Sequence, residues 1–443
     1  MCGIAGIIGE NENNVAIETI LETIGYRGPD GLFYQKMDRV AFGHARLSII
    51  DLKVSANQPM VDESTGNVII FNGEIYNYLE LKKEIGNRYP FKTDSDTEVL
   101  LAAYHVFGID FFLYLRGMFA FAIYDHSKRK ILLARDRVGI KPLYYRKLGK
   151  SVFFASEIKA IINLAGKSES INQIKAYEFL ANRQLDTNEQ TFFEGVFQLL
   201  PAHYVWVDTN GNIEEPKPFW DFPQTGKRKL TKESEQEFVE VFNETISKHL
   251  RSDVEIGSFL SGGIDSSSVT CFALRNMHQA NLATFSAIVP YYHSENALIK
   301  DVVGFNDKII PHEFLLDGAG YFDDIEKIIY HHDEPILDGS MYAHYKLCQL
   351  AKENKIKVLL SGAGGDELFG GYGSHIYAYH STLLANLKFK KYLQEVNAVS
   401  ENSSWPRKSL IAKSLYENLP FALKRKLKNL QLQRRNAHLE IQP

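Results

Sequence analysis

The ten residues Phe259-Leu260-Ser261-Gly262-Gly263-Ile264-Asp265-Ser266-Ser267-Ser268 decide how the second half of the chain folds. The apolar run before them, residues 254–260, predicts a buried strand, and residues 268–274 predict a helix. The glycines therefore fall at a strand-to-helix turn, where unpaired backbone N–H groups and the helix dipole attract phosphate. Asp265 would repel a bare phosphate, so the turn predicts a magnesium–nucleotide complex.

This turn lacks the Gly-Lys-Ser/Thr sequence of a Walker A loop, so transfer of a terminal phosphate is not the first expectation. Its Ser-Gly-Gly-x-Asp-Ser sequence resembles the pyrophosphate loop of ATP pyrophosphatases, which adenylate a carboxylate or carbonyl oxygen and release pyrophosphate. A surface turn rich in glycine and serine is the alternative. The predicted strand before the turn and the predicted helix after it argue against that alternative.

Length and composition predict a globular protein of about two domains, because the chain has 443 residues, 45% hydrophobic and 23% charged. The net charge of −4 argues against a dedicated nucleic-acid binder. No apolar run is long enough to cross a bilayer, and the apolar start lacks the basic flank of a signal peptide, so no membrane partner is expected. Cys2, Cys271 and Cys348 are too few and scattered for a disulfide framework, which predicts a reducing cytoplasm.

The start of the chain predicts a nucleophile, because removal of the initiator methionine leaves Cys2 as the first residue. A free α-amino group has a reference pKa of about 8, so it can take the thiol proton and leave a thiolate. An incidental cysteine in a small apolar strand is the alternative. The segments that follow argue against it.

Four positions after Cys2 describe a receptor for an amino acid. Arg46 ends a predicted strand among apolar residues, so its guanidinium group is expected to bind a carboxylate. Asn72 and Gly73 follow the predicted strand 68–71, and the Asn72 side chain with the Gly73 N–H at its end can form an oxyanion hole. Asp96 precedes the predicted helix 99–106 and can bind an α-ammonium group. Glutamine fits a receptor that holds these groups and presents its side-chain amide to a thiolate.

Over roughly residues 2 to 373, the chain resembles the glutamine-hydrolysing asparagine synthetase family, whose N-terminal part is a class II glutamine amidotransferase domain. The resemblance implies an α+β N-terminal-nucleophile hydrolase sandwich, followed by an α/β parallel-sheet domain like those of the ATP pyrophosphatases. The segments that carry the resemblance are Met1–Ile4, Tyr26–Asp30, His44–Ser48, Phe71–Asn77, Ser95–Glu98 and Ser261–Ser267.

The same resemblance implies roles for residues in the first half. Cys2 would be the nucleophile, and Asn72 with Gly73 would donate to the oxyanion. The residues expected around the glutamine are Arg46, Ile49, Ile50, Asn72, Gly73, Glu74 and Asp96.

In the second half, a second glycine-rich loop, residues 361–372, follows the predicted strand 357–360. Loops at the carboxyl ends of parallel strands converge on one crevice, so both loops are expected at one ATP site. Asp265 and Asp366 would share Mg²⁺ on the pyrophosphate. The resemblance places the ATP contacts at Leu260, Ser261, Gly262, Gly263, Asp265, Ser266, Ser267, Ala287, Ile288, Ser361 and Gly362.

The predicted domains are a glutaminase domain over residues 2–213, a linker over 214–232 and a synthetase domain over 233–443, incomplete at its end. The linker prediction rests on a segment rich in proline and tryptophan followed by a polar stretch. Residues 119–125 and 130–136 predict a hairpin. An apolar stripe is expected in the core of the helix before the phosphate loop, formed by Phe238, Val241, Phe242, Thr245, Ile246 and His249.

Two polar stretches receive no role in the chemistry. Residues 135–145 match the family but have the composition of a solvated charged turn. Residues 331–334, His-His-Asp-Glu, are interpreted as a polar cluster at a helix end before Pro335, in preference to a metal site.

The chain departs from the family pattern at two places. Position 363 is Ala, where asparagine synthetases commonly carry a carboxylate, and alanine cannot transfer a proton. The end is short, which favours truncation or a divergent short member of the family. The basic stretch 421–430 with Arg434 and Arg435 is interpreted as a solvated helix or the remainder of a truncated domain, in preference to a contact with an anionic surface.

The leading hypothesis is ATP-dependent amide synthesis, in which glutamine is hydrolysed at Cys2 and the ammonia reaches an adenylated aspartate, giving asparagine, AMP and pyrophosphate. One alternative keeps this chemistry with another carboxylate acceptor, a sugar acid or a peptide. The other is a glutaminase or regulatory protein whose second domain is inactive. A homodimer is one option for the assembly, which the sequence leaves open.

Overall fold

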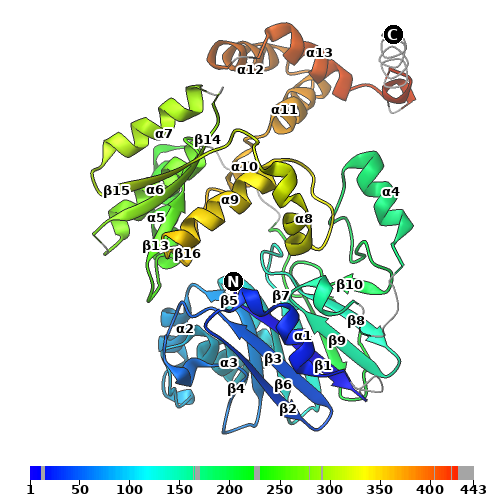
Figure 1. Cartoon of the computed structure of the whole chain (residues 1–443). Coiled ribbons are helices and arrows are strands. Elements are labelled where there is room, and N and C mark those ends of the chain that lie inside the picture. Colours follow the sequence, from blue (N-terminus) through cyan, green and yellow to red (C-terminus); the bar gives the residue numbers. More distant parts are fainter. Residues whose placement is uncertain are drawn as a thin grey trace. The chain divides into compact units, whose positions relative to one another are not determined.

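A computed structural model describes residues 1–10, 15–162, 164, 170–223, 230–278, 280–290, 293–403, 405–420 and 422–427. The chain forms two compact units (Figure 1). Unit 1 consists of residues 1–263 and 267–361, and unit 2 of residues 264–266 and 362–443. The predicted boundary at residues 214–232 remains a prediction, and residues 224–229 lie outside the described part.

The N-terminal part of unit 1 contains two six-stranded antiparallel sheets (Figure 1). The first has the order β10-β8-β9-β1-β3-β2 and the second the order β12-β11-β7-β6-β5-β4. The strands of the first sheet are β1 (Gly3–Gly9), β2 (Gly31–Met37), β3 (Val40–Arg46), β8 (Tyr144–Leu148), β9 (Ser151–Ala155) and β10 (Val196–Gln198). Those of the second are β4 (Met60–Val61), β5 (Val68–Ile75), β6 (Gly117–Asp125), β7 (Lys130–Arg135), β11 (His203–Asp208) and β12 (Lys217–Pro218).

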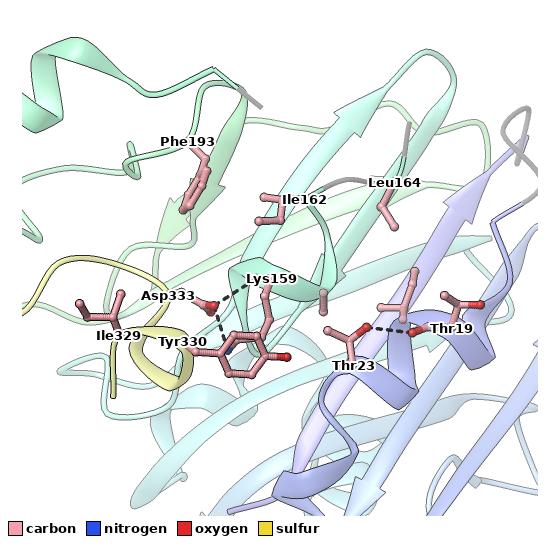
Figure 2. A pocket seen from close by; sticks show the side chains of 11 residues that line it. Thr19, Thr23, Lys159, Ile162, Leu164, Phe193, Ile329, Tyr330 and Asp333 are labelled. Carbon is pink, nitrogen blue, oxygen red and sulfur yellow. Dashed lines mark hydrogen bonds and ion pairs between the residues drawn. The ribbon is translucent and has the colours of Figure 1, made fainter. Parts of the chain in front are cut away.

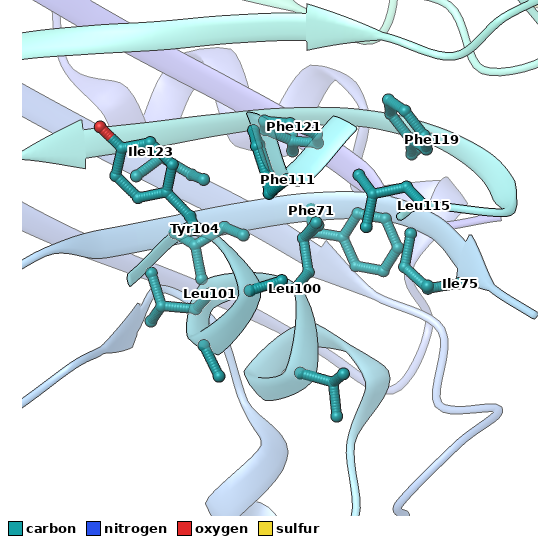
Figure 3. Packing of buried hydrophobic residues seen from close by; sticks show 14 of the residues in the cluster. Phe71, Ile75, Leu100, Leu101, Tyr104, Phe111, Leu115, Phe119, Phe121 and Ile123 are labelled. Atoms are coloured by element: carbon teal, nitrogen blue, oxygen red, sulfur yellow. The ribbon is translucent and has the colours of Figure 1, made fainter. Parts of the chain in front are cut away.

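Strand periodicity explains how the second sheet is buried on both faces. In β6, Phe119, Phe121 and Ile123 belong to the cluster that packs against helices, as Figure 3 shows. The alternate residues Ala120 and Ala122 belong to the cluster between the two sheets. Because both sets are apolar, this strand is a continuous hydrophobic run, and the predicted hairpin of β6 with β7 is confirmed.

Helices cover the outer faces of the two sheets. α1 (Ile17–Thr23) packs against the first sheet, and α3 (Asp96–Phe107) with α2 (Tyr78–Ile85) against the second. The result is a four-layer arrangement of helix, sheet, sheet and helix, which confirms the predicted N-terminal-nucleophile hydrolase sandwich. A further helix, α4 (Gln173–Asn182), lies between β9 and β10 in the chain.

The C-terminal part of unit 1 contains a four-stranded sheet with the order β15-β14-β13-β16, in which every pair is parallel. Helices cover both faces, which confirms the predicted α/β domain. Its elements, in part shared with unit 2 at residues 264–266, are α5 (Lys232–His249), β13 (Ile256–Phe259), α6 (Ile264–Asn276), β14 (Leu282–Ile288), α7 (His293–Phe305), β15 (Ile309–Leu315), α8 (Tyr321–His332), α9 (Ser340–Glu353) and β16 (Val358–Leu360).

Unit 2 is helical over its described residues. Its elements are α10 (Gly365–Phe369), α11 (Gly373–Ala385), α12 (Phe389–Asn402) and α13 (Arg407–Glu417). Leu383, Tyr392, Val396 and Leu410 form its core. Of the predicted basic stretch 421–430 with Arg434 and Arg435, only residues 422–427 are described.

For two segments, the prediction of which residues are buried is wrong. The stripe on α5 is only partly in the core: Ile246 is buried, but Phe238 and Val241 are 49% and 57% exposed. The segment 135–145 is not a solvated turn, because Arg135 and Asp136 are buried. Among the described helices, none is long and apolar enough to cross a membrane.

Candidate active sites

Cys2 lies immediately before β1, with its thiol between the peptide groups of Leu47. The Leu47 N–H donates to Sγ at 3.3 Å, and Sγ lies 3.5 Å from the Leu47 carbonyl oxygen. Arg27 donates from Nε to the Cys2 carbonyl oxygen at 2.9 Å. Burial raises the pKa of the Cys2 thiol, so a nearby base is needed to form the thiolate at neutral pH.

The amino group next to Cys2 in the chain is that of Met1, and its surroundings lower its pKa. Burial, and after it the charge of Arg27, lowers the pKa of the Met1 amino group to about 6. An amino group in these surroundings is mostly neutral at pH 7 and can accept a proton. The same surroundings would favour the neutral amine of Cys2 once Met1 is removed.

Lys141 is a residue near this site that the sequence analysis missed. Its side chain is buried, Nζ lies 3.0 Å from Met1 Sδ, and burial lowers its pKa. The turn that carries it folds inward because the Asp136 carboxylate accepts N–H groups from Val138, Ile140 and Lys141 at 2.9–3.2 Å. An aspartate whose side chain accepts from the N–H groups that follow it is a known signal for such a turn. The composition of the segment had instead indicated a solvated turn.

Asn72 and Gly73 lie inside β5 and not after its end, which corrects the prediction. They pair with Ala120 and Phe119 of β6. Asn72 is buried, and its Nδ2 has no hydrogen-bond partner among the described residues. A buried donor without a partner costs about 1–3 kcal/mol, so its retention is typical of a site that a ligand completes. A side chain at position 73 would overlap the Met118 carbonyl oxygen.

Two buried carboxyl groups follow Asn72. Asp96 begins α3, and its Oδ2 accepts the Ile75 N–H at 3.0 Å. Burial raises the pKa of Asp96 to about 6, while burial and then the Asp96 charge raise that of Glu74 to about 7. A bound ammonium group would stabilise both carboxylates, as the prediction of an α-ammonium partner at Asp96 requires.

Arg46 holds a loop. Its Nη1 donates to the Lys53 carbonyl oxygen at 3.0 Å, and its Nη2 donates to that of Asp51 at 2.6 Å. The loop contains Ile49 and Ile50, both half-buried. The expected contacts of all three residues with glutamine remain predictions.

A pH-dependent stability follows from Glu74. Because its folded-state pKa lies above the ordinary 4.5, the folded protein retains a proton that the unfolded chain has lost. Stability therefore falls as the pH rises from 4.5 through about 7. We expect Glu74→Gln to stabilise the protein at about pH 8 and to change little at about pH 4. The urea midpoint of unfolding, measured at both pH values, tests this expectation, and Glu84→Gln at an exposed position is the control. If the midpoints of the wild type and of Glu74→Gln changed equally with pH, the expectation would be wrong.

In unit 1, the phosphate loop follows the central strand β13. Gly262 has a φ of 78°, and a side chain there would press on the backbone of α7. Leu260 is held against β14, because its N–H donates to Phe285 O at 3.0 Å and its carbonyl accepts from Ser286 Oγ at 2.7 Å. The Ser267 hydroxyl is buried without a partner among the described residues, as a phosphate-binding group would be before its ligand arrives.

The other predicted nucleotide contacts in unit 1 lie at the same edge of the parallel sheet. Ala287 and Ile288 end β14, and Ser361 follows β16. β13 lies between β14 and β16, so these residues and residues 260–263 follow three adjacent parallel strands. From β13 the chain adds β14 and β15 on one side and β16 on the other, so the strand order changes direction beside β13. Open α/β sheets bind ligands at such switch points.

Unit 2 contains both predicted magnesium ligands. Asp265, in the first turn of α6, lies so close to Gly365 that a side chain there would overlap its carboxylate. Asp366 follows Gly365, so the two aspartates lie on segments in contact. Similarly, a side chain at Gly362 would overlap the Ser266 N–H.

Paired carboxylates match the hard oxygen ligands that Mg²⁺ prefers, so these residues fit the ion. Within the described ranges, no group of three or more His, Cys, Asp or Glu side chains is arranged to hold a metal. Magnesium at Asp265 and Asp366 would therefore complete its coordination with phosphate oxygens and water, and would neutralise phosphate charge.

Comparison with known proteins defines the class. Residues 1–220 match the family model described as a glutamine amidotransferase domain, and residues 237–440 match the one described as asparagine synthase. A Methanocaldococcus jannaschii protein, whose name places it among the glutamine-hydrolysing asparagine synthetases, is 33% identical over 424 residues, 90% of this chain and 80% of that protein. The chain belongs to the glutamine-hydrolysing asparagine synthetase family.

Two further relatives, with similar identity to this chain, carry different names. Asparagine synthetase 1 of Bacillus subtilis, glutamine-hydrolysing by name, is 35% identical over 393 residues, which are 84% of this chain. A Gibberella zeae protein named amidase chry2 is 31% identical over 405 residues, also 84% of this chain. The chain spans 59% of the length of each.

Proposed function

We propose that this protein synthesises an amide from a carboxylate, with glutamine as nitrogen donor and ATP as activator. The observation that carries the proposal is the N-terminal cysteine site, in which the buried Nδ2 of Asn72 has no partner among the residues that the structure describes, in one chain with the phosphate loop of the parallel sheet. A glutaminase alone would need only the first of these features. The family supports the combination.

In the first half-reaction, the α-amine of Cys2 takes the thiol proton, and the thiolate adds to the side-chain amide carbon of glutamine. The tetrahedral oxyanion accepts hydrogen bonds from Asn72 Nδ2 and the Gly73 N–H. Its collapse breaks the C–N bond and releases ammonia, with the proton returned by the α-ammonium group. Water then hydrolyses the thioester to glutamate. Arg46 and Asp96 would bind the carboxylate and ammonium groups of glutamine.

In the second half-reaction, an acceptor carboxylate attacks the α-phosphate of ATP, forming an acyl-adenylate and releasing pyrophosphate. Ammonia adds to the acyl carbon, and AMP leaves. Ser261, Ser266 and Ser267 would donate hydrogen bonds to the phosphates at the start of α6, as helix N-termini and glycine-rich turns do.

Aspartate is the acceptor we propose, giving asparagine. Ala363 and the 31% identical relative named an amidase favour a second candidate, the same chemistry on another carboxylate. Aspartate-dependent pyrophosphate release distinguishes the two. The cytoplasm remains the expected compartment, because the three cysteines are free.

Asp265→Asn tests the nucleotide half. We expect pyrophosphate release to fall by about 100-fold, because a neutral amide would bind the phosphate-bridging cation poorly. Glutamine hydrolysis should be unchanged. The control is Asp301→Asn, an exposed residue on α7. Wild-type pyrophosphate release by Asp265→Asn would remove this residue from the site.

A further inference from the structure

A line of buried ionic contacts leads from the backbone of Cys2 to the end of α8. The sequence analysis interpreted residues 331–334 as a polar helix end, and α8 does end at His332. These residues belong to the stretch that matches asparagine synthase, whereas Cys2 belongs to the glutamine amidotransferase stretch. The contacts therefore connect the two halves of the family architecture inside unit 1.

The first contacts lie beside the nucleophile. Arg27, whose Nε donates to the Cys2 carbonyl oxygen, pairs through Nη1 with Glu157 Oε1 at 2.7 Å. The side chains of Arg27 and Glu157 are 9% and 6% exposed. The Tyr26 hydroxyl also donates to Glu157. A buried carboxylate thus fixes the guanidinium that holds the Cys2 backbone.

The next contacts reach α8. Lys159 Nζ lies 2.7 Å from Glu157 Oε2 and 2.8 Å from Asp333 Oδ1. Asp333 also accepts the N–H groups of Ile158 at 2.7 Å and of Lys159 at 3.3 Å. Figure 2 shows this ion pair of Asp333 and Lys159 in the lining of a pocket that Tyr330 also lines. Asp333 therefore binds both the backbone and the side chain of the segment that carries Glu157.

Asp333 occupies a demanding backbone position. It caps α8 with a φ of 69°, a left-handed conformation that glycine adopts more readily. An aspartate here costs more than glycine would, and its carboxylate is used fully by three partners. Because the charges are buried, the loss of one member leaves the next without its partner, so the contacts respond as a group.

We propose that Asp333 is a positioning residue for Cys2, acting through Lys159, Glu157 and Arg27. Through it, the synthase half of the chain sets the geometry of the glutamine-hydrolysing nucleophile. The inference rests on the proposed function of Cys2. It concerns the placement of the nucleophile and not the binding of glutamine, whose expected contacts at Arg46 and Asp96 lie on other elements.

The test is Asp333→Asn in the full chain, assayed for glutamate formation from glutamine. The neutral side chain of asparagine cannot form the ion pair with Lys159, so the Cys2 thiol should be displaced slightly. We expect kcat to fall about tenfold, because small displacements of a reacting group lower the reaction rate strongly. KM should stay within about twofold. Lys159→Met should lower kcat similarly, and the double variant should lose no more than either single variant, as expected for one connected group. The exposed Glu326→Gln, on the same helix, is the matched control and should behave as wild type.

Wild-type kcat in Asp333→Asn, a loss confined to KM, or additive losses in the double variant would each overturn the inference. Ammonia-dependent pyrophosphate release should be retained in Asp333→Asn, and its loss in parallel with glutamine hydrolysis would indicate general unfolding and also overturn it. If even the wild type releases no pyrophosphate, the proposed function fails, but glutamine hydrolysis still tests Asp333.

Discussion

Cys2→Ala should lower glutamine hydrolysis by more than about 10⁴-fold, the scale of loss when a nucleophile is removed. The residues that contact Cys2 through hydrogen bonds, Leu47 and Arg27, have no side chain that could replace the thiol as nucleophile. Glutamate formation measures the loss. Pyrophosphate release with ammonia as nitrogen source should be unchanged, because that half-reaction needs no thiol.

Cys271→Ala is the matched control, since Cys271 is also a free thiol but lies on α6. It should hydrolyse glutamine as the wild type does. If Cys2→Ala still made amide from glutamine, with no ammonia supplied, the assignment of the nucleophile would be wrong.

Asn72→Ala should lower kcat for glutamine hydrolysis by about 10²–10³-fold, with a small change in KM. The buried Nδ2 lacks a partner among the described residues, so its hydrogen bond is available to the charge that develops on the oxyanion. Removal of one oxyanion donor typically costs this much, and the loss appears in kcat because the ground-state carbonyl needs the donor less.

Steady-state kinetics with glutamine measure both constants, and the exposed Asn212→Ala serves as control. A kcat for Asn72→Ala within about threefold of wild type would exclude the oxyanion role. A large increase in KM alone would move Asn72 to substrate binding.

Local sequence patterns located individual strands and the glycine loop, and the family resemblance implied how the strands assemble. The apolar runs of β5 and β6 and the glycine loop after β13 each have a signal within ten residues, and the structure confirms the sandwich and the parallel sheet. Strand ends were less certain: β5 continues through Asn72 and Gly73, because glycine at 73 lets the Met118 backbone approach. Periodicity shows that a strand exists, but not where its pairing ends.

The polar contacts around Cys2 had no comparable signal. Arg27, Glu157 and Asp333 are separated by 130 and 176 residues. Arg27 lies in the segment 26–30 that carries the family resemblance, but no local pattern connects it to Glu157 or Asp333. Lys141 was misjudged for the same reason, since burial of a charge depends on partners that only the folded chain brings together. Exposure of Phe238 and Val241 on α5 likewise depends on which elements pack beside that helix.

The most direct test of ATP-dependent amide synthesis is one assay with ATP, magnesium, aspartate and glutamine labelled with ¹⁵N at its side-chain amide. We expect pyrophosphate release that depends on aspartate, with ¹⁵N in the new amide of asparagine. Another carboxylate that replaces aspartate would keep the chemistry and change the acceptor. Release of all ¹⁵N as ammonium, with no pyrophosphate for any carboxylate offered, would contradict the account and leave a glutaminase.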